Sequence, residues 1–255
     1  MTMPFAGSAG PGMVNALLTP VALTFPAGVF TMPRSVPILA LLGCLSATPA
    51  LPGAWPKEQG HGFVSADIRL SRPRTNLLYG EVSDYRTIYF EYGVTDRLTM
   101  GLDLGRSVSG EEKAVVFARY PIPLGSDRFR FAAELGLGRI DEARVLRPGL
   151  SFGTSFEAWP DAWAWIAVDA IAEHSLDAGS TDYKIDATFG VTFPNRWKGF
   201  VQLQTGAPHD EEPFLRIAPS VVMPVGKRSH VELGATWGVS GDDQLGIKLG
   251  IWHAF

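Results

Sequence analysis

The residues best suited to catalysis lie near the middle of the sequence, where Ser175 directly follows His174. Asp169, Glu173 and Asp177 supply carboxylates within a few positions. A serine with a histidine base is an arrangement that hydrolases use for nucleophilic attack. Neighbouring residues of a regular strand point to opposite faces, however, so a strand here would separate His174 from Ser175. We therefore expect no enzyme activity and keep a hydrolase as the less favoured alternative.

Charged side chains form a second, larger set, because they recur at alternate positions opposite rows of large apolar residues. The set comprises Asp67, Arg69, Glu91, Asp103, Arg119, Arg130, Glu134, Arg147, Asp169, Glu173, Lys184, Asp186, Arg216, Glu232 and Lys248. Buried charges need partners of opposite sign or water. If this face is internal, the set either lines an aqueous passage or closes it with ion pairs, and both interpretations stay open.

The elements that carry these charges are predicted strands, because the alternation has a period of two. In residues 183–193, for example, apolar side chains from Tyr183 to Phe193 alternate with polar or small residues from Lys184 to Thr192. About twelve such runs follow one another: 62–71, 85–93, 97–106, 114–121, 128–139, 145–156, 163–174, 183–193, 197–206, 214–223, 230–239 and 245–255.

Two kinds of connection alternate between the runs. Short turns are centred on Asp96, Asp127, Asp161, Asn195 and Lys227, at nearly constant intervals that indicate a hairpin repeat. The other connections are mostly longer and acidic, as in residues 140–144 and 207–213. Their carboxylates either bind divalent cations or serve as solvated turn formers.

Three features indicate that the apolar face points outward into lipid. The polar face is rich in glycine, which weakens a solvent-exposed strand but relieves crowding inside a closed sheet. The runs are close to the length of about 9–11 residues that a tilted membrane strand needs. Aromatic residues, which suit a membrane–water boundary, gather near the short turns; they are Tyr92, Tyr120, Phe129, Trp159, Trp163, Phe193 and Trp197.

The end of the chain makes the interpretation more specific. The sequence closes on LGIKLGIWHAF, and this alternating strand with terminal Phe255 resembles the C-terminal assembly signal of bacterial outer-membrane β-barrel proteins, although His253 departs from the usual apolar residue. The turn Tyr92–Leu98 resembles turns common in those proteins. The resemblance is porin-like in a general sense and assigns no subfamily. The predicted fold is all-β, a closed antiparallel up-and-down transmembrane barrel spanning residues 62–255.

The resemblance implies a location and partners. We expect a Gram-negative outer-membrane protein that contacts lipid and lipopolysaccharide and meets the barrel-assembly machinery through its C-terminal strand. The expected function is a narrow channel for passive or facilitated diffusion of a small solute. The alternatives are an occluded structural barrel without transport and a lipid-modifying hydrolase.

Composition excludes other classes. The chain has 255 residues, 46% hydrophobic and 19% charged, with a formal net charge of -4, so nothing favours nucleic acid binding. No Cys/His spacing typical of zinc and no glycine-rich phosphate loop is present in the sequence, so we expect no cofactor.

The N-terminal part differs from the rest, because Arg34 is the one charge in its first 56 residues. From Met32, a basic residue, an apolar run and small residues up to Ala50 follow the layout of a secretory signal. We expect residues 1–50 to be an N-terminal extension plus signal peptide, with the true start at Met32 and cleavage near Ala50. A real apolar arm over residues 1–31 is the alternative. Residues 51–61 are expected to form a short periplasmic segment before the barrel. Cys44, the one cysteine, lies in the signal, where lipidation is a further alternative.

Overall fold

The computed structural model describes residues 53–107, 109–124 and 128–255. The predicted extension and signal peptide, with Met32, Cys44 and Ala50, lie outside the described residues. Over the described residues the chain forms twelve strands: β1 Gly62–Pro73, β2 Ser83–Gly93, β3 Thr99–Ser107, β4 Glu112–Pro121, β5 Phe129–Ile140, β6 Ala143–Trp159, β7 Ala162–Ser175, β8 Thr181–Thr192, β9 Lys198–Ala207, β10 Phe214–Pro224, β11 Ser229–Ser240 and β12 Gln244–Ala254.

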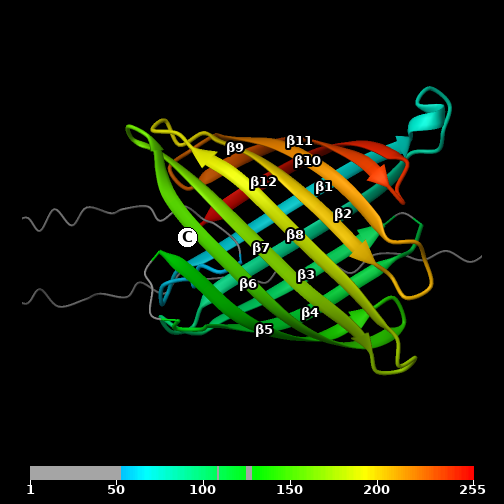
Figure 1. The fold of residues 1–255 in the computed structure, drawn as a ribbon, viewed down its shortest axis with the longest axis horizontal. Helices are drawn as coiled ribbons and strands as arrows, with labels where there is room; N and C mark the ends of the chain where they lie inside the picture. The colour runs from blue at the N-terminus through cyan, green and yellow to red at the C-terminus, as the bar shows by residue number, and fades with distance from the viewer. Residues whose placement is uncertain (1–52, 108, 125–127) are drawn as a thin grey trace, which may run out of the picture. The chain divides into compact units, whose positions relative to one another are not determined.

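Every strand pairs antiparallel with its neighbours in sequence, and β1 also pairs with β12, so the sheet closes into a barrel (Figure 1). The closing ladder runs from Phe63 opposite Ala254 to Pro73 opposite Gln244. Closure leaves no edge with unpaired N–H and C=O groups, which a sheet in lipid could not tolerate. The predicted fold class is therefore confirmed, and the predicted runs differ from the strand bounds by no more than three residues.

The connections depart from the predicted division into short turns and longer loops. At the predicted loop end, residues 141–142 join β5 to β6 and residues 241–243 join β11 to β12, whereas residues 94–98 and 193–197 form connections at the end of the predicted short turns, called the short-turn end below. The two tightest connections, β5–β6 and β6–β7, each contain a non-glycine residue with positive φ, Asp141 (φ 52°) and Asp161 (φ 62°). The β1–β2 connection contains a short 3-10 helix, η1 Arg74–Asn76. Within the described part of the chain, no helix is long and apolar enough to cross a membrane.

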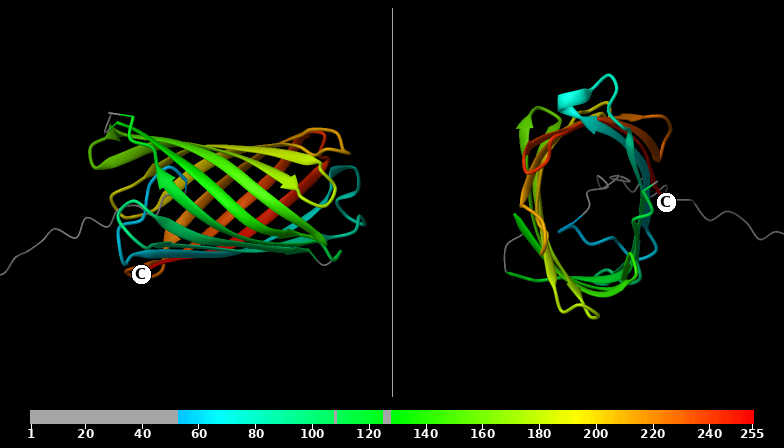
Figure 2. Two further views of the ribbon diagram at one scale, coloured as in Figure 1. Left: turned by 90° about the horizontal axis from the view of Figure 1, so that it is seen from below. Right: turned by 90° about the vertical axis from the view of Figure 1, so that its right-hand side faces the viewer.

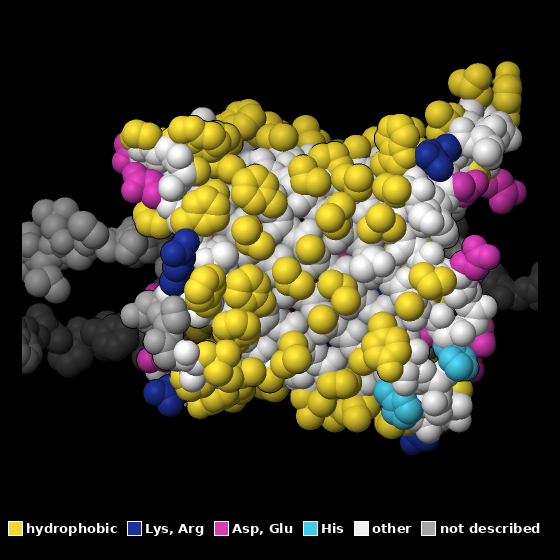
Figure 3. All heavy atoms as spheres, viewed as in Figure 1, with side chains coloured by type: hydrophobic (Ala, Val, Ile, Leu, Met, Phe, Trp, Pro, Cys, Tyr) yellow, Lys and Arg dark blue, Asp and Glu magenta, His cyan; other side chains and the backbone are white. Residues whose placement is uncertain are grey.

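The outer face of the barrel is apolar. Large hydrophobic side chains cover its flank, whereas charged side chains gather toward the two ends (Figure 3). Exposed apolar side chains in the strands include Val116, Leu135, Leu137, Leu150, Phe189, Ile247 and Ile251. A water-soluble sandwich or barrel would turn such residues inward, so this belt is typical of a surface that faces lipid.

The aromatic residues near the short turns are all exposed. One of them does not belong to the outer belt. Trp163 pairs in register with Thr192, which shares the inward face with Thr188 and Gly190. Trp163 therefore lies at an inward register position at the rim, in step with Trp165 and Asp169 of the same strand, and remains 52% exposed there.

Candidate functional site

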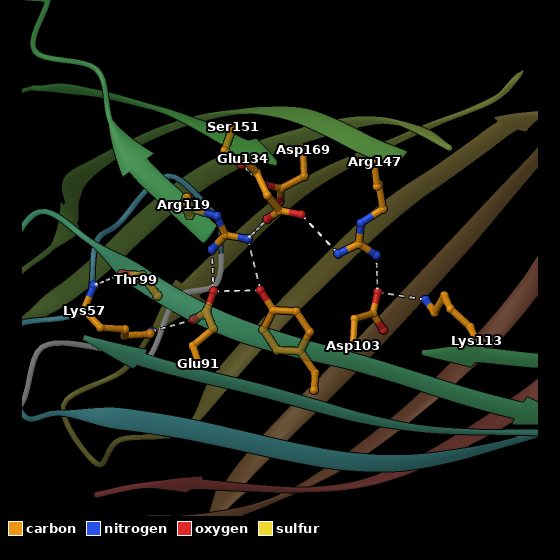
Figure 4. A network of polar contacts seen from close by, with 11 residues as sticks. Lys57, Glu91, Thr99, Asp103, Lys113, Arg119, Glu134, Arg147, Ser151 and Asp169 are labelled. Atoms are coloured by element: carbon orange, nitrogen blue, oxygen red, sulfur yellow. Dashed lines mark hydrogen bonds and ion pairs between the residues drawn. The ribbon is translucent and has the colours of Figure 1, made fainter. Parts of the chain in front are cut away.

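The inside of the barrel holds a chain of charged side chains from five consecutive strands, β2 to β6 (Figure 4). Arg119 of β4 links the first two carboxylates of this chain. It donates hydrogen bonds to Glu91 of β2 and to Glu134 of β5, the latter with 2.6 Å between Nη2 and Oε2. It also donates to the hydroxyl of Tyr89, 3.0 Å away, and that hydroxyl in turn donates to Glu91 over 2.7 Å.

Arg147 of β6 continues the chain. It donates to Glu134 over 3.1 Å and to Asp103 of β3 over 2.6 Å. Lys113 of β4 lies 2.9 Å from the same Asp103 carboxylate. Three carboxylates, two guanidinium groups and one ammonium group thus alternate in sign around the inner wall, with Glu91 at one end of the chain and Lys113 at the other.

These charges are shielded from water. Glu91 has no exposed surface, and Arg147 is 3% exposed. Leaving a charge buried without a partner is costly, so the alternation of sign is what makes this arrangement tolerable. The network therefore gives the wall from β2 to β6 a rigid polar lining.

The opposite wall carries isolated pairs rather than a chain. Lys184 lies 2.6 Å from Glu173. Lys248 lies 3.1 Å from Glu232, which also accepts a hydrogen bond from the indole nitrogen of Trp252 over 2.9 Å. Both signs are again paired, so the lining has no large excess of either charge.

The remaining predicted residues also lie at inward register positions. Asp67 accepts a hydrogen bond from Thr87, and Asp169 accepts one from Ser151 over 2.6 Å. Asp186 lies directly opposite Asp169 on the neighbouring strand. Three further members of the set have contacts of different kinds. Arg69 lies over the ring of Tyr85, and Arg130 lies opposite Gly153 on the neighbouring strand. Arg216 forms an ion pair with Asp242 over 2.5 Å.

Aromatic residues inside the barrel are the main feature that sequence reasoning missed. Phe63, Trp252, Phe200 and Trp165 make successive ring contacts with centroids 5.8, 6.1 and 6.0 Å apart. On the charged wall, the ring of Phe117 lies beneath Arg119 and Arg147. The signal was present in the sequence, because these rings occupy the face that alternation labels polar.

Phe117 also explains one of the inner glycines. A Cβ on Gly101, which lies directly opposite on β3, would meet the Phe117 ring. Glycine at this position therefore allows a large ring to lie flat against the wall.

The acidic loops lie at the end of the barrel opposite the predicted short turns. Two of their carboxylates accept hydrogen bonds from neighbouring connections. Asp177, in the β7–β8 loop, accepts hydrogen bonds from the backbone of Arg144 (2.7 Å) and from its guanidinium (2.6 Å). These bonds hold the pKa of the Asp177 carboxyl below its usual value. Asp182 accepts from the backbone of His209 in the same way, over 2.8 Å. Asp177 and Asp182 thus act as turn formers, as one of the two interpretations of the acidic loops predicts.

The serine–histidine pair is not assembled for catalysis. His174 shares a hydrogen bond of 2.9 Å with Thr181, whereas the Ser175 hydroxyl accepts one from the backbone of Ala178. Ser175 is buried on the inner face, as is Glu173. In the described part of the chain, no group of three or more His, Cys, Asp or Glu side chains is arranged to hold a metal ion.

Comparison with known proteins finds similar solved structures but no similar sequence. No family model matches the sequence, and no curated protein matches it significantly. The structure is similar to that of the KdgM porin, with 12% identity and a TM-score of 0.53 over 75% of this chain and 99% of that one. It is similar to the NanC porin, with 10% identity and a TM-score of 0.53 over 74% and 98% of the two chains.

A third neighbour is the COG4313 outer membrane channel from Pseudomonas putida F1, with 10% identity and a TM-score of 0.54 over 80% and 99% of the two chains. The closed twelve-stranded barrel is thus a fold that these porins and this outer membrane channel are similar to, in agreement with the fold that the sequence resemblance predicted. Identities this low establish the fold and assign no subfamily.

Proposed function

We propose that this protein is an outer-membrane channel through which small polar solutes diffuse. The observation that carries the proposal is the division of the barrel into two faces. An apolar belt covers the outside, and polar and charged groups from nearly every strand line the inside. A barrel whose outer face prefers lipid and whose inner face prefers water is suited to carry polar molecules across a membrane.

The lining also bears on selectivity. Its acidic and basic groups are interspersed and largely paired, as in Arg119 with Glu134 and Lys184 with Glu173. We therefore expect a narrow pathway with weak charge selectivity. One of the solved neighbours is a porin in complex with disordered oligogalacturonate.

Location and assembly belong to the same proposal. The short turns and both chain ends of the barrel would lie in the periplasm, after removal of a signal peptide near Ala50. The acidic loops would face lipopolysaccharide outside. The C-terminal strand ending at Phe255 would be recognised during barrel assembly; its ring lies against Gly62 and Phe90 at the closing seam.

Proteoliposomes provide the test. Vesicles that contain the purified protein should swell in an isotonic solution of a small neutral sugar at a rate that falls as the sugar becomes larger. Vesicles with heat-denatured protein are the control. Equal swelling with and without folded protein would contradict the channel.

A second candidate, the occluded structural barrel, is favoured by one specific observation. The chain of ion pairs from Glu91 to Asp103 occupies lumen space along five strands. If the pairs close the pathway, swelling will be absent in the wild type and will appear when members of the chain are replaced by smaller neutral residues.

A further inference from the structure

The segment that precedes β1 lies inside the barrel. Residues 53–61, blue in Figure 2, run within the ring of strands at the end where the short turns are found. The sequence predicted residues 51–61 only as a short segment before the barrel. The structure adds that its side chains contact the inner wall on two sides.

One contact is aromatic. Trp55 packs against the cluster formed by Trp165 and Ala167 of β7, as Phe200 of β9 also does. A Cβ on Gly153 of β6 would meet the Trp55 indole, so glycine leaves the space that this ring fills. Ala54 beside it is 1% exposed.

The other contact is ionic. Lys57 Nζ lies 3.3 Å from Glu91 Oε2, at the end of the charged chain on the facing wall. The backbone N–H of Lys57 donates a hydrogen bond to the Thr99 hydroxyl over 3.1 Å, and its ammonium group lies 5.2 Å from the centre of the Phe63 ring. Glu91 is completely buried, so Lys57 contributes to neutralising a charge that water does not reach.

The backbone fixes the end of the segment to the rim. Gln59 N donates to the Asp96 carboxylate over 3.1 Å. Gly60 N donates to Gly93 O, and Gly93 N donates to His61 O, each over 2.9 Å. The segment is therefore tied to the β2–β3 hairpin while Trp55 and Lys57 reach into the lumen.

We propose that residues 53–59 are an internal plug that narrows the channel at its short-turn end, with Trp55 and Lys57 holding it in place. This inference rests on the proposed channel function. Removal of the plug widens the lumen, because an aromatic side chain and a lysine leave the space between two walls.

Two variants should release the plug, and each of them removes a different contact. Lys57→Gln removes the ion pair with Glu91, and Gly153→Val places a side chain where the Trp55 indole packs. Matched controls are Lys227→Gln, an exposed lysine of a short turn, and Gly199→Val, where an added Cβ meets open space. Single-channel current of each purified protein in planar bilayers is the measurement. We expect a severalfold higher conductance for both release variants and wild-type conductance for both controls.

A second measurement, the rate of lysine acetylation, shows whether the plug is bound inside the barrel and requires no current recording. The Lys57 side chain is 11% exposed, so acetylation by a water-soluble amine reagent should be much slower at Lys57 than at exposed Lys227 in the folded wild type. Mass spectrometry of the labelled peptides gives both rates. Gly153→Val should bring the Lys57 rate close to that of Lys227.

The outcomes separate the two proposals. Higher conductance together with faster Lys57 labelling in Gly153→Val supports the plug. Equal conductance in wild type and both release variants overturns the plug and leaves the channel intact. Rapid labelling of Lys57 in the wild type also overturns the plug. Absence of current in every variant overturns the proposed function and the plug with it.

Discussion

Arg147 of β6 reaches over two intervening strands to Asp103 of β3, with 2.6 Å between Nη1 and Oδ2. The bond does not follow the hydrogen-bonded ladder of the sheet. It crosses the curved inner surface and links β3 to β6, two strands that do not pair with each other. The lumen charges therefore act as a connected set, and changing one of them should affect both the electrostatics of the pathway and the cohesion of the wall.

Asp103→Asn should make the channel more selective for anions. The replacement removes one negative charge and leaves Lys113 and Arg147, its two partners, beside the pathway. The reversal potential in a salt gradient across a planar bilayer measures this change, and it should move toward the anion equilibrium potential. Asp161→Asn, in an exposed short turn, should leave the reversal potential unchanged. A shift toward cations would contradict the assignment of Asp103 to the pathway.

Glu134→Gln should destabilise the barrel. Glu134 accepts hydrogen bonds from both Arg119 and Arg147, and it is 9% exposed. Loss of charge-assisted bonds of this kind costs roughly 1.5–3 kcal/mol. Urea-dependent unfolding followed by tryptophan fluorescence gives the free energy of unfolding. The exposed carboxylate of Glu157 provides a control variant, Glu157→Gln, for which the midpoint should stay where it is in the wild type.

Leu135→Arg should weaken insertion of the barrel into lipid. Leu135 lies in the middle of β5 on the outer face, where it is 53% exposed. An arginine on the lipid face near the bilayer centre costs about 2–4 kcal/mol. The folded fraction after refolding into lipid vesicles, read as heat-modifiable migration on gels, should fall.

The matched substitution is Val225→Arg, in the short β10–β11 turn, where the side chain is 63% exposed outside the strands. Its folded fraction should equal that of the wild type. Equal folding of the two arginine variants would mean that the outer face of β5 does not meet lipid.

The Asp177–Arg144 contact should stabilise the loop end of the barrel in a pH-dependent way. The pKa of Asp177 is lower in the folded protein than in the unfolded chain, because Arg144 donates hydrogen bonds to the ionised carboxylate. A lowered folded pKa gives stability that is complete above the unfolded pKa and is lost as the pH falls through the folded pKa. Asp177→Asn should therefore lower the urea midpoint at neutral pH and have no effect in strong acid. An equal effect at both pH values would indicate packing rather than charge.

Local pattern was enough to predict the strands and their closure. Alternation places Met100, Leu102 and Leu104 on one face of β3 and Thr99, Gly101 and Asp103 on the other, and the structure has the same division. The pairing of successive hairpins then leaves one way to close the sheet, because the free edges of β1 and β12 have only each other to pair with. Strand bounds were least accurate at β6, which continues to Trp159 through an irregular register.

The inside of the barrel was predictable only in part. Alternation identifies Arg119 and Glu134 as inward residues, and their hairpin places them directly opposite each other. It treats the inward face as polar, however, and so overlooks Trp165 and Phe200. The position of Trp55 depends on contacts with strands far along the chain, for which a local period carries no information.

The most direct test of a solute pathway through this lumen uses two adjacent residues of β9. Gln202 faces inward, where it donates a hydrogen bond to Thr188, and Leu203 faces outward with 44% of its surface exposed. Each is replaced by cysteine, and a charged, membrane-impermeant thiol reagent is added while current is recorded in a planar bilayer. Wild-type protein treated in the same way is the background control. The account predicts that the reagent reduces the current of Gln202→Cys and leaves that of Leu203→Cys unchanged. An unaltered current in Gln202→Cys, or a reduced one only in Leu203→Cys, would contradict it.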